Sequence, residues 1–125
     1  MKKRVFVSFA MEDLTNKNLF CGQAKNTLVP YEFVDMSVKT PWDEMWKTNC
    51  RARIKSCSGM IVLISSKTKY ASGAIWEIKC GIEEGLKVHG IYIKDGNFFN
   101  KPHELNNINC EPWNWLHVQR FIDSL

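Results

Sequence analysis

The 125-residue sequence lacks the loops and motifs that mark several common enzyme classes. Neither G-x-G-x-x-G nor G-x-x-x-x-G-K-[ST] occurs, so the usual glycine-rich phosphate loops are absent. There is no G-x-S-x-G nucleophile elbow. The three histidines, His89, His103 and His117, are far apart in sequence and form no ligand pattern. We therefore expect no P-loop nucleotidase, no hydrolase of the nucleophile-elbow type and no metal site.

Long apolar runs, basic blocks and paired cysteines are also missing. No apolar run approaches the roughly 20 residues that span a bilayer, and the run at 5–10 is too short for a signal peptide. The basic residues form no block beyond 2–4, and the net charge is +4, so neither membrane nor nucleic acid is an expected partner. The five cysteines include no C-x-x-C pair, which indicates a reduced, cytoplasmic domain rather than a disulfide scaffold.

Ordinary globular composition, 45% hydrophobic and 24% charged, is what remains, with no repeat, linker or low-complexity segment. We expect one domain over residues 1–125. Strands are predicted at 4–9, 31–36, 60–64, 88–93 and 108–110. Helices are predicted from 14 to about 24, from 41 to 57, through the region 73–85 and from 114 onward, with a loop at 26–30. This alternation predicts an α/β fold with a parallel sheet.

The second predicted helix, 41–57, has a clear start signal. Thr40 is the expected cap, Pro41 takes the first helical position, and Asp43 follows three residues after the cap.

Ligands of parallel sheets bind beyond the carboxyl ends of the strands. That rule selects the segments 8–10, 35–37 and 65–66, together with the start of the helix that carries Glu77. We expect these four segments to meet at one edge of the sheet. A phosphorelay receiver would carry Asp at the end of the third strand, where this chain has Ser65.

Glu77 is the sharpest candidate for a functional side chain. Its helical neighbours three and four residues away are all small and none is basic: Gly73, Ala74, Cys80 and Gly81. We therefore expect an unpaired carboxylate beside open space, and a carboxylate in such a setting is a candidate site group. The alternative is an exposed helix carboxylate, as most glutamates are.

Several other residues have both a functional and a plain interpretation. Arg51 and Arg53 could meet phosphate or lie solvated on a helix, and Trp76 could line a site or pack between helices. Ser8, Phe9 and Ser37 would be ordinary loop residues if they were taken singly.

The segment 5–13, V-F-V-S-F-A-M-E-D, resembles the first conserved box of TIR domains, a strand ending in F-x-S-[YF] before an acidic helix start. The remainder looks most like the TIR-like branch that contains the TIR subunit of the bacterial Thoeris antiphage system. The pieces that carry this likeness extend over nearly the whole chain: 22–26, 31–37, 46–54, 61–64 and 76–80.

The resemblance implies a flavodoxin-like fold, a three-layer sandwich around a parallel sheet of about five strands in order 2-1-3-4-5. It also implies cleavage of NAD at the nicotinamide–ribose bond, with NAD as substrate and no cofactor. The family's essential Glu lies on the helix after the third strand, where this chain has Glu77. Many relatives carry Trp four residues before that Glu, whereas Gly73 stands there in this chain and Trp76 adjoins Glu77.

Further residues receive roles through the same resemblance. The expected substrate-binding residues are Ser8, Phe9, Ala10, Asp35, Met36, Ser37 and Trp76, with Arg51 and Arg53 for the pyrophosphate. The expected product is a cyclic or otherwise modified ADP-ribose that diffuses to a nucleotide-sensing effector protein, and homo-oligomers are expected because many TIR sites are completed between subunits.

Two other functions stay open. A non-catalytic interaction module would use surface loops such as 35–42 to bind another TIR domain. A nucleoside 2-deoxyribosyltransferase-like enzyme would share the fold type and a catalytic Glu.

Overall fold

The computed structural model describes residues 3–24 and 31–125. The loop predicted at 26–30 lies outside this range. Five strands form one sheet: β1 (Lys3–Ser8), β2 (Tyr31–Val34), β3 (Gly59–Ile64), β4 (Lys87–Tyr92) and β5 (Cys110–Pro112). The sheet is parallel throughout, in the order β2-β1-β3-β4-β5. The predicted flavodoxin-like topology is therefore confirmed.

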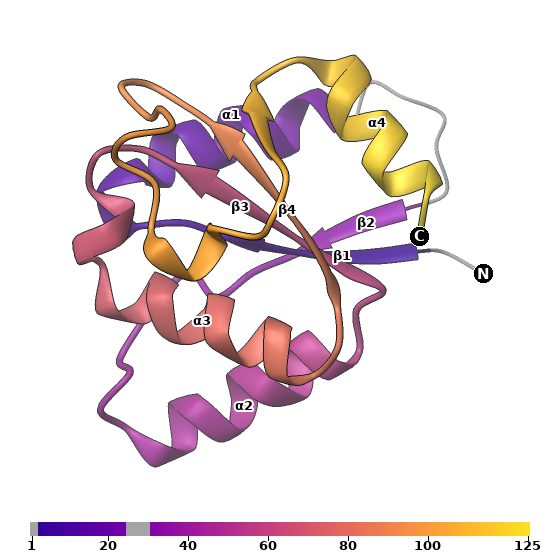
Figure 1. Cartoon of the computed structure of the whole chain (residues 1–125). Coiled ribbons are helices and arrows are strands. Elements are labelled where there is room, and N and C mark those ends of the chain that lie inside the picture. The colour runs from indigo at the N-terminus through magenta and orange to yellow at the C-terminus, as the bar shows by residue number, and fades with distance from the viewer. Residues whose placement is uncertain (1–2, 25–30) are drawn as a thin grey trace.

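In the described part of the chain, four α-helices cover the two faces of the sheet (Figure 1). They are α1 (Leu14–Ala24), α2 (Glu44–Lys55), α3 (Ser72–Glu83) and α4 (Trp115–Asp123). Helices α2 and α3 lie on one face, and α1 and α4 lie on the other. Residues 3–24 and 31–125 also contain three short 3-10 helices: η1 (Met11–Asp13), η2 (Thr68–Tyr70) and η3 (His103–Leu105).

The alternation of side chains along the central strands divides the core into two halves. Val5 and Val7 of β1 point to the half that α1 and α4 close with Phe20, Val118 and Phe121. Phe6 points to the other half, which α2 and α3 close with side chains such as Trp46, Ile54 and Ile78. Because β3 is buried along its whole length, the sheet is fixed between two apolar layers.

The start of α2 corrects the prediction. The helix begins at Glu44, and its cap is Asp43, whose side chain accepts a hydrogen bond from the Met45 amide at 2.8 Å. Residues 40–43 form a turn instead, closed by the Asp43 amide on the Thr40 carbonyl. Because both Thr40 and Asp43 are good caps, the local sequence cannot decide between the two starts. The loop between β2 and α2 is longer as a result.

A buried polar network ties together the carboxyl ends of β1, β3 and β4. Asp13 is fully buried, accepts a hydrogen bond from the Ser65 hydroxyl at 2.6 Å, and pairs with Lys94 at 2.9 Å. One carboxylate oxygen of Asp13 accepts from the Ser65 hydroxyl and the other from the Lys94 ammonium group. The network therefore fixes this edge of the sheet without leaving an unpaired buried ion.

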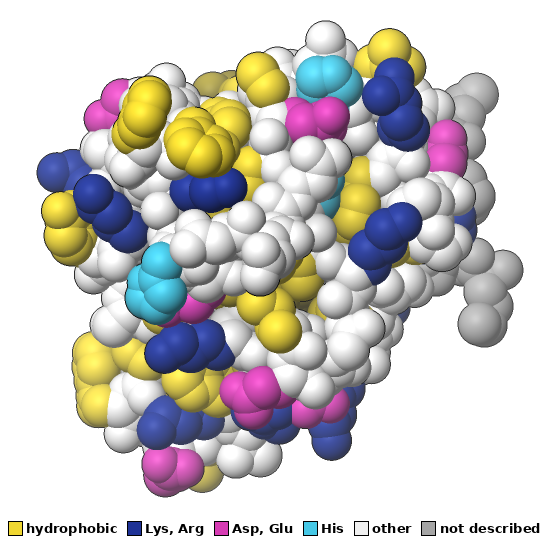
Figure 2. Space-filling model, in the orientation of Figure 1, with side chains coloured by type: hydrophobic (Ala, Val, Ile, Leu, Met, Phe, Trp, Pro, Cys, Tyr) yellow, Lys and Arg dark blue, Asp and Glu magenta, His cyan; other side chains and the backbone are white. Residues whose placement is uncertain are grey.

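The face of the molecule shown in Figure 2 carries Lys and Arg side chains interspersed with Asp and Glu. No extended basic stripe of the kind that follows a nucleic-acid backbone runs across it.

Candidate functional site

Glu77 lies on the side of α3 that faces the sheet, and it is fully buried. Ser8, the last residue of β1, donates its hydroxyl hydrogen to the Glu77 carboxylate at 2.8 Å. The strand end and the helix, 69 residues apart in sequence, therefore meet at this carboxylate, as the rule of converging strand ends predicted.

The expectation of an unpaired Glu77 was wrong. Lys39, from the loop between β2 and α2, holds both carboxylate oxygens with its ammonium group, at 2.8 and 2.7 Å. The Lys39 side chain is only 3% exposed, so the ion pair is sealed from water. Helical spacing could exclude only partners on the same helix, whereas this partner lies 38 residues away in sequence.

Gly73 makes room for this lysine. A Cβ at position 73 would lie 2.8 Å from Lys39 Cβ and 3.0 Å from its Cδ, closer than real side chains approach. The stem of Lys39 therefore lies across the helix where other residues would carry a side chain. A tryptophan at position 73, as many relatives have, would occupy the space that the Lys39 side chain fills in this chain.

The loop that carries Lys39 is anchored at both ends. Met36 is buried in the core beside Trp46, and the Trp46 indole donates to the Val38 carbonyl at 2.7 Å. At the far end, Asp43 caps α2. These contacts position the ammonium group of Lys39 at 4.3 Å from the centre of the Phe9 ring, between that ring and the Glu77 carboxylate.

Burial dominates the electrostatics of Glu77. Removal from water raises the pKa of this carboxyl to about 7, although Lys39 and the Ser8 hydroxyl act in the opposite direction. The Cys50 thiol lies 4.0 Å from the carboxylate, and burial, with Glu77 as the next cause, raises its pKa far above the usual range. Cys50 is therefore a neutral neighbour and not a reactive thiolate.

The structure brings the first group of predicted site residues together. Ser8 bonds to Glu77, and Phe9 covers Lys39. Ala10 is buried as well and directly precedes η1. Their roles toward a substrate stay predictions.

The other predicted residues have their own partners. Asp35 pairs with Lys17 at 3.1 Å, Met36 is a core residue, and Ser37 is exposed. Trp76 packs edge-on against Trp46 of α2, with ring centres 5.3 Å apart. No described hydrogen bond or ion pair joins any of these four side chains to Glu77.

The two arginines are also engaged. Arg51 pairs with Glu84 and Glu83 near the end of α3, and Arg53 donates to the Asp35 carbonyl at 2.7 Å. The structure does not bring them to the Glu77 carboxylate, so their role with pyrophosphate stays an untested prediction.

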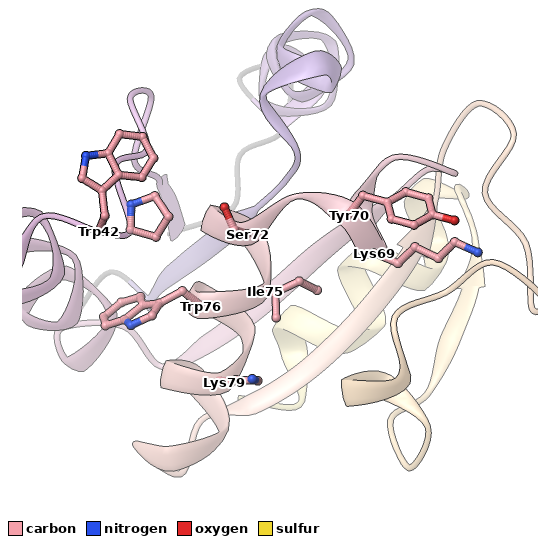
Figure 3. Close-up of a pocket in the computed structure, with 8 residues that line it drawn as sticks. Trp42, Lys69, Tyr70, Ser72, Ile75, Trp76 and Lys79 are labelled. Carbon is pink, nitrogen blue, oxygen red and sulfur yellow. The ribbon is translucent and has the colours of Figure 1, made fainter.

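Two hollows lie near the start of α3, and the inner one reaches the lysine of the buried ion pair. The inner hollow, of about 210 Å³, reaches Lys39, Gly73 and Ala74. The outer hollow, of about 600 Å³, extends along the exposed side of α3 (Figure 3). The residues of the outer hollow used below are Trp42, Lys69, Tyr70, Ile75, Trp76 and Lys79. The two hollows share four residues, Pro41, Trp42, Tyr70 and Ser72, so they are direct neighbours on the surface.

Sequence reasoning missed Lys39, Trp42 and Tyr70. A signal for Lys39 was available, because it follows the segment 35–37, which was expected at the ligand edge, and is the only cation between residues 35 and 43. Trp42 was expected at a helix start, or in a surface loop on the non-catalytic alternative, and Tyr70 between a strand and a helix, and neither was given a role in binding a ligand.

Within residues 3–24 and 31–125, no group of three or more His, Cys, Asp or Glu side chains could hold a metal ion. Over the same residues, no helix combines the length and apolarity needed to cross a membrane.

Comparison with solved structures identifies the class of fold. The TIR domain of the Toll-related receptor TRR-2 from the lower metazoan Hydra magnipapillata matches with a TM-score of 0.73 and 18% identity, covering 95% of this chain and 97% of that chain. The TIR domains of the activated Roq1 resistosome, which recognises the pathogen effector XopQ, match with a TM-score of 0.55 and 15% identity over 73% of this chain and 57% of that chain. The fold is that of a TIR domain.

The profile of one family, described as Thoeris protein ThsB, TIR-like domain, matches residues 6–97. The chain belongs to this family of ThsB TIR-like domains, which confirms the resemblance derived from its motifs. The search of curated protein sequences gave no match.

Proposed function

We propose that this TIR-like domain cleaves NAD at the nicotinamide–ribose bond and that Glu77 is its catalytic residue. The observation that carries the proposal is the buried Glu77 carboxylate, held by Ser8 at the carboxyl end of β1. A carboxylate removed from water interacts strongly with positive charge, and the ligand edge of a parallel sheet is where a substrate would bring such charge.

The chemistry needs one well-placed anion. As the C1′–N bond breaks, its electron pair moves to the nicotinamide nitrogen, which becomes neutral, and positive charge develops on the ribose. Glu77 can accept hydrogen bonds from ribose hydroxyls and stabilise that charge. Water, or a nucleophile of the ADP-ribose itself, then bonds to C1′ and gives up a proton. The nicotinamide needs no acid to leave, so a single carboxylate is sufficient.

The position of Lys39 supports the same assignment. Its ammonium group lies between the Glu77 carboxylate and the face of the Phe9 ring, so this site already stabilises a cation. A ribosyl cation held in the same place would meet the same two groups. Lys39 must first move away, which makes the closed ion pair the resting state of the proposed enzyme.

Membership of the ThsB family supports a role in antiphage defence. We propose that the product is a cyclic or modified ADP-ribose, which activates a partner effector protein. The balance between cyclisation and hydrolysis depends on whether water reaches C1′ before an internal nucleophile does.

A non-catalytic interaction module is the second candidate, and the ion pair itself favours it. Glu77 is fully buried and saturated by Ser8 and Lys39, which is also what a purely structural ion pair requires. On this alternative the carboxylate never meets a substrate, and loop 35–42 binds another TIR domain.

The test is nicotinamide release from NAD, followed by chromatography over a wide range of protein concentration so that self-association is included. Glu77→Gln keeps the shape of the side chain and removes the charge, and we expect it to lower turnover at least about a hundredfold. Glu83→Gln is the matched control, because Glu83 lies on the same helix and its side chain is 62% exposed. Wild-type turnover by a folded Glu77→Gln protein excludes the proposed mechanism.

A further inference from the structure

The outer hollow has features of a nucleotide site that the Glu77 carboxylate does not explain. It is an open depression of about 600 Å³ beside the exposed side of α3, large enough for an adenosine diphosphate group. Figure 3 shows Trp42 and Trp76 on one side of it and Tyr70 and Lys69 on the other, with Ser72 and Ile75 between.

Two large aromatic side chains stand at this hollow with little cover. Trp42 is 76% exposed and Tyr70 is 77% exposed, and they come from different elements, the β2–α2 loop and η2. Neither ring packs against another aromatic ring in the described part of the chain. The Lys69 ammonium group lies 5.1 Å from the centre of the Tyr70 ring. Among the described residues the Trp42 ring has neither a ring partner nor a cation over it, and a flat aromatic face open to solvent at a hollow is suited to stacking on a planar base.

The charges at the outer hollow all have one sign. Lys69 and Lys79 line it, and no acidic side chain does. In addition, no side chain caps the first turn of α3, which begins at Ser72 in the wall of the hollow. Two ammonium groups together with free amide hydrogens provide a favourable environment for phosphate oxygens.

The border that the outer hollow shares with the inner one indicates how a ligand would lie across the two. Trp42, Tyr70 and Ser72 border both hollows, and the inner one ends at Lys39 above Glu77. A dinucleotide that placed its reacting ribose at Glu77 would extend its remaining half outward past these residues. Arg51 and Arg53, the alternative phosphate partners, are already occupied by Glu84 and the Asp35 carbonyl.

We propose that the outer hollow binds the ADP half of a dinucleotide, with the adenine base stacked on Trp42 or Tyr70 and the pyrophosphate held by Lys69 and Lys79. The proposal rests on the proposed function for the identity of the dinucleotide. The binding itself needs no cleavage and no displacement of Lys39.

Calorimetric titration of the full chain with ADP tests the site. We expect Trp42→Ala and Tyr70→Ala each to raise the dissociation constant at least about fivefold, the loss typical of one stacked base. The Lys69→Ala/Lys79→Ala double variant should bind ADP more weakly and show a flatter dependence on salt. Phe99→Ala and Lys55→Ala are matched controls, since both side chains are exposed and neither lines the outer hollow.

Three results overturn the proposal. One is ADP binding that is unchanged in all the hollow variants. Another is binding of inorganic pyrophosphate as tight as that of ADP and insensitive to Trp42→Ala. The third is self-association that depends on Trp42 and Tyr70 without ADP binding, which would assign the hollow to a second copy of the chain.

Nicotinamide release separates this proposal from the proposed function. If ADP binds through Trp42 and the lysines but no variant releases nicotinamide, the site stands and the enzymatic function fails. If nicotinamide is released at wild-type efficiency by the hollow variants, the enzyme stands and the assignment of the hollow fails.

Discussion

At the scale of single residues, the account centres on two opposite charges in a dry site. Burial destabilises the ionised form of Glu77, and Lys39 and Ser8 offset part of that cost. The same lysine blocks access to the carboxylate. Lys39 therefore has two opposite effects on the proposed reaction. It favours the ionised form of Glu77, which the reaction needs, and it blocks substrate from reaching the carboxylate. Each effect leads to its own prediction.

The first prediction concerns pH. The pKa of Glu77 is raised to about 7, so below that pH the carboxyl is protonated and cannot stabilise a ribosyl cation. We expect kcat/KM for nicotinamide release to rise about tenfold per pH unit up to about 7 and then level off. A profile that is flat between pH 5 and 8 at constant ionic strength contradicts the assignment of Glu77.

The second prediction removes the charge of Lys39. Lys39→Met retains much of the stem and deletes the ammonium group. Burial then raises the pKa of Glu77 with the Ser8 hydroxyl still acting against it, so the midpoint of the pH profile should move upward. Above the new midpoint, turnover should exceed that of the wild type by about tenfold, because a charge-assisted pair of about 1.5–3 kcal/mol no longer closes the site. Lys47→Met, which removes a partly exposed lysine on α2, is the control.

At the scale of elements, the close approach between loop 35–43 and α3 closes the site. The loop lies against the helix because Gly73 has no side chain, and Trp46 holds the loop through the Val38 carbonyl. The closed state is thus a property of how the two elements pack, in addition to the ion pair itself.

The third prediction changes that packing without touching either charge. In Gly73→Ala the new methyl group lies within 2.8 Å of Lys39 Cβ, so the loop must shift and the Lys39–Glu77 pair should weaken. We expect faster amide exchange in residues 37–40 and higher nicotinamide release, measured on the same preparation.

Gly22→Ala in α1 is the control, since its Cβ would meet nothing within 4 Å. It should stabilise the fold by up to about 1 kcal/mol and leave turnover unchanged. If both glycine variants changed turnover equally, the effect would come from general stability, and the proposed role of Gly73 in packing would be contradicted.

At the scale of the whole molecule, the sheet was predictable because its signals are local. Apolar runs such as 60–64 mark buried strands, and their alternation with helices leaves few topologies. The meeting of Ser8 with Glu77 followed from the rule of strand ends.

The lysine was not predictable by the same means. Its contact joins residues 39 and 77 through a loop whose path depends on the late start of α2 and on the space above Gly73. Local propensity could not decide between Thr40 and Asp43 as the cap, and helical spacing has no information on partners from other elements.

The most direct measurement of the central claim compares nicotinamide release by four proteins at a pH above the midpoint of the Lys39→Met profile: the wild type, Lys39→Met, Glu77→Gln and the double variant. We predict that Lys39→Met releases nicotinamide faster than the wild type, and that Glu77→Gln reduces release to background both alone and together with Lys39→Met. Release by the folded double variant at the rate of Lys39→Met would contradict the account, because the carboxylate would then have no part in the reaction.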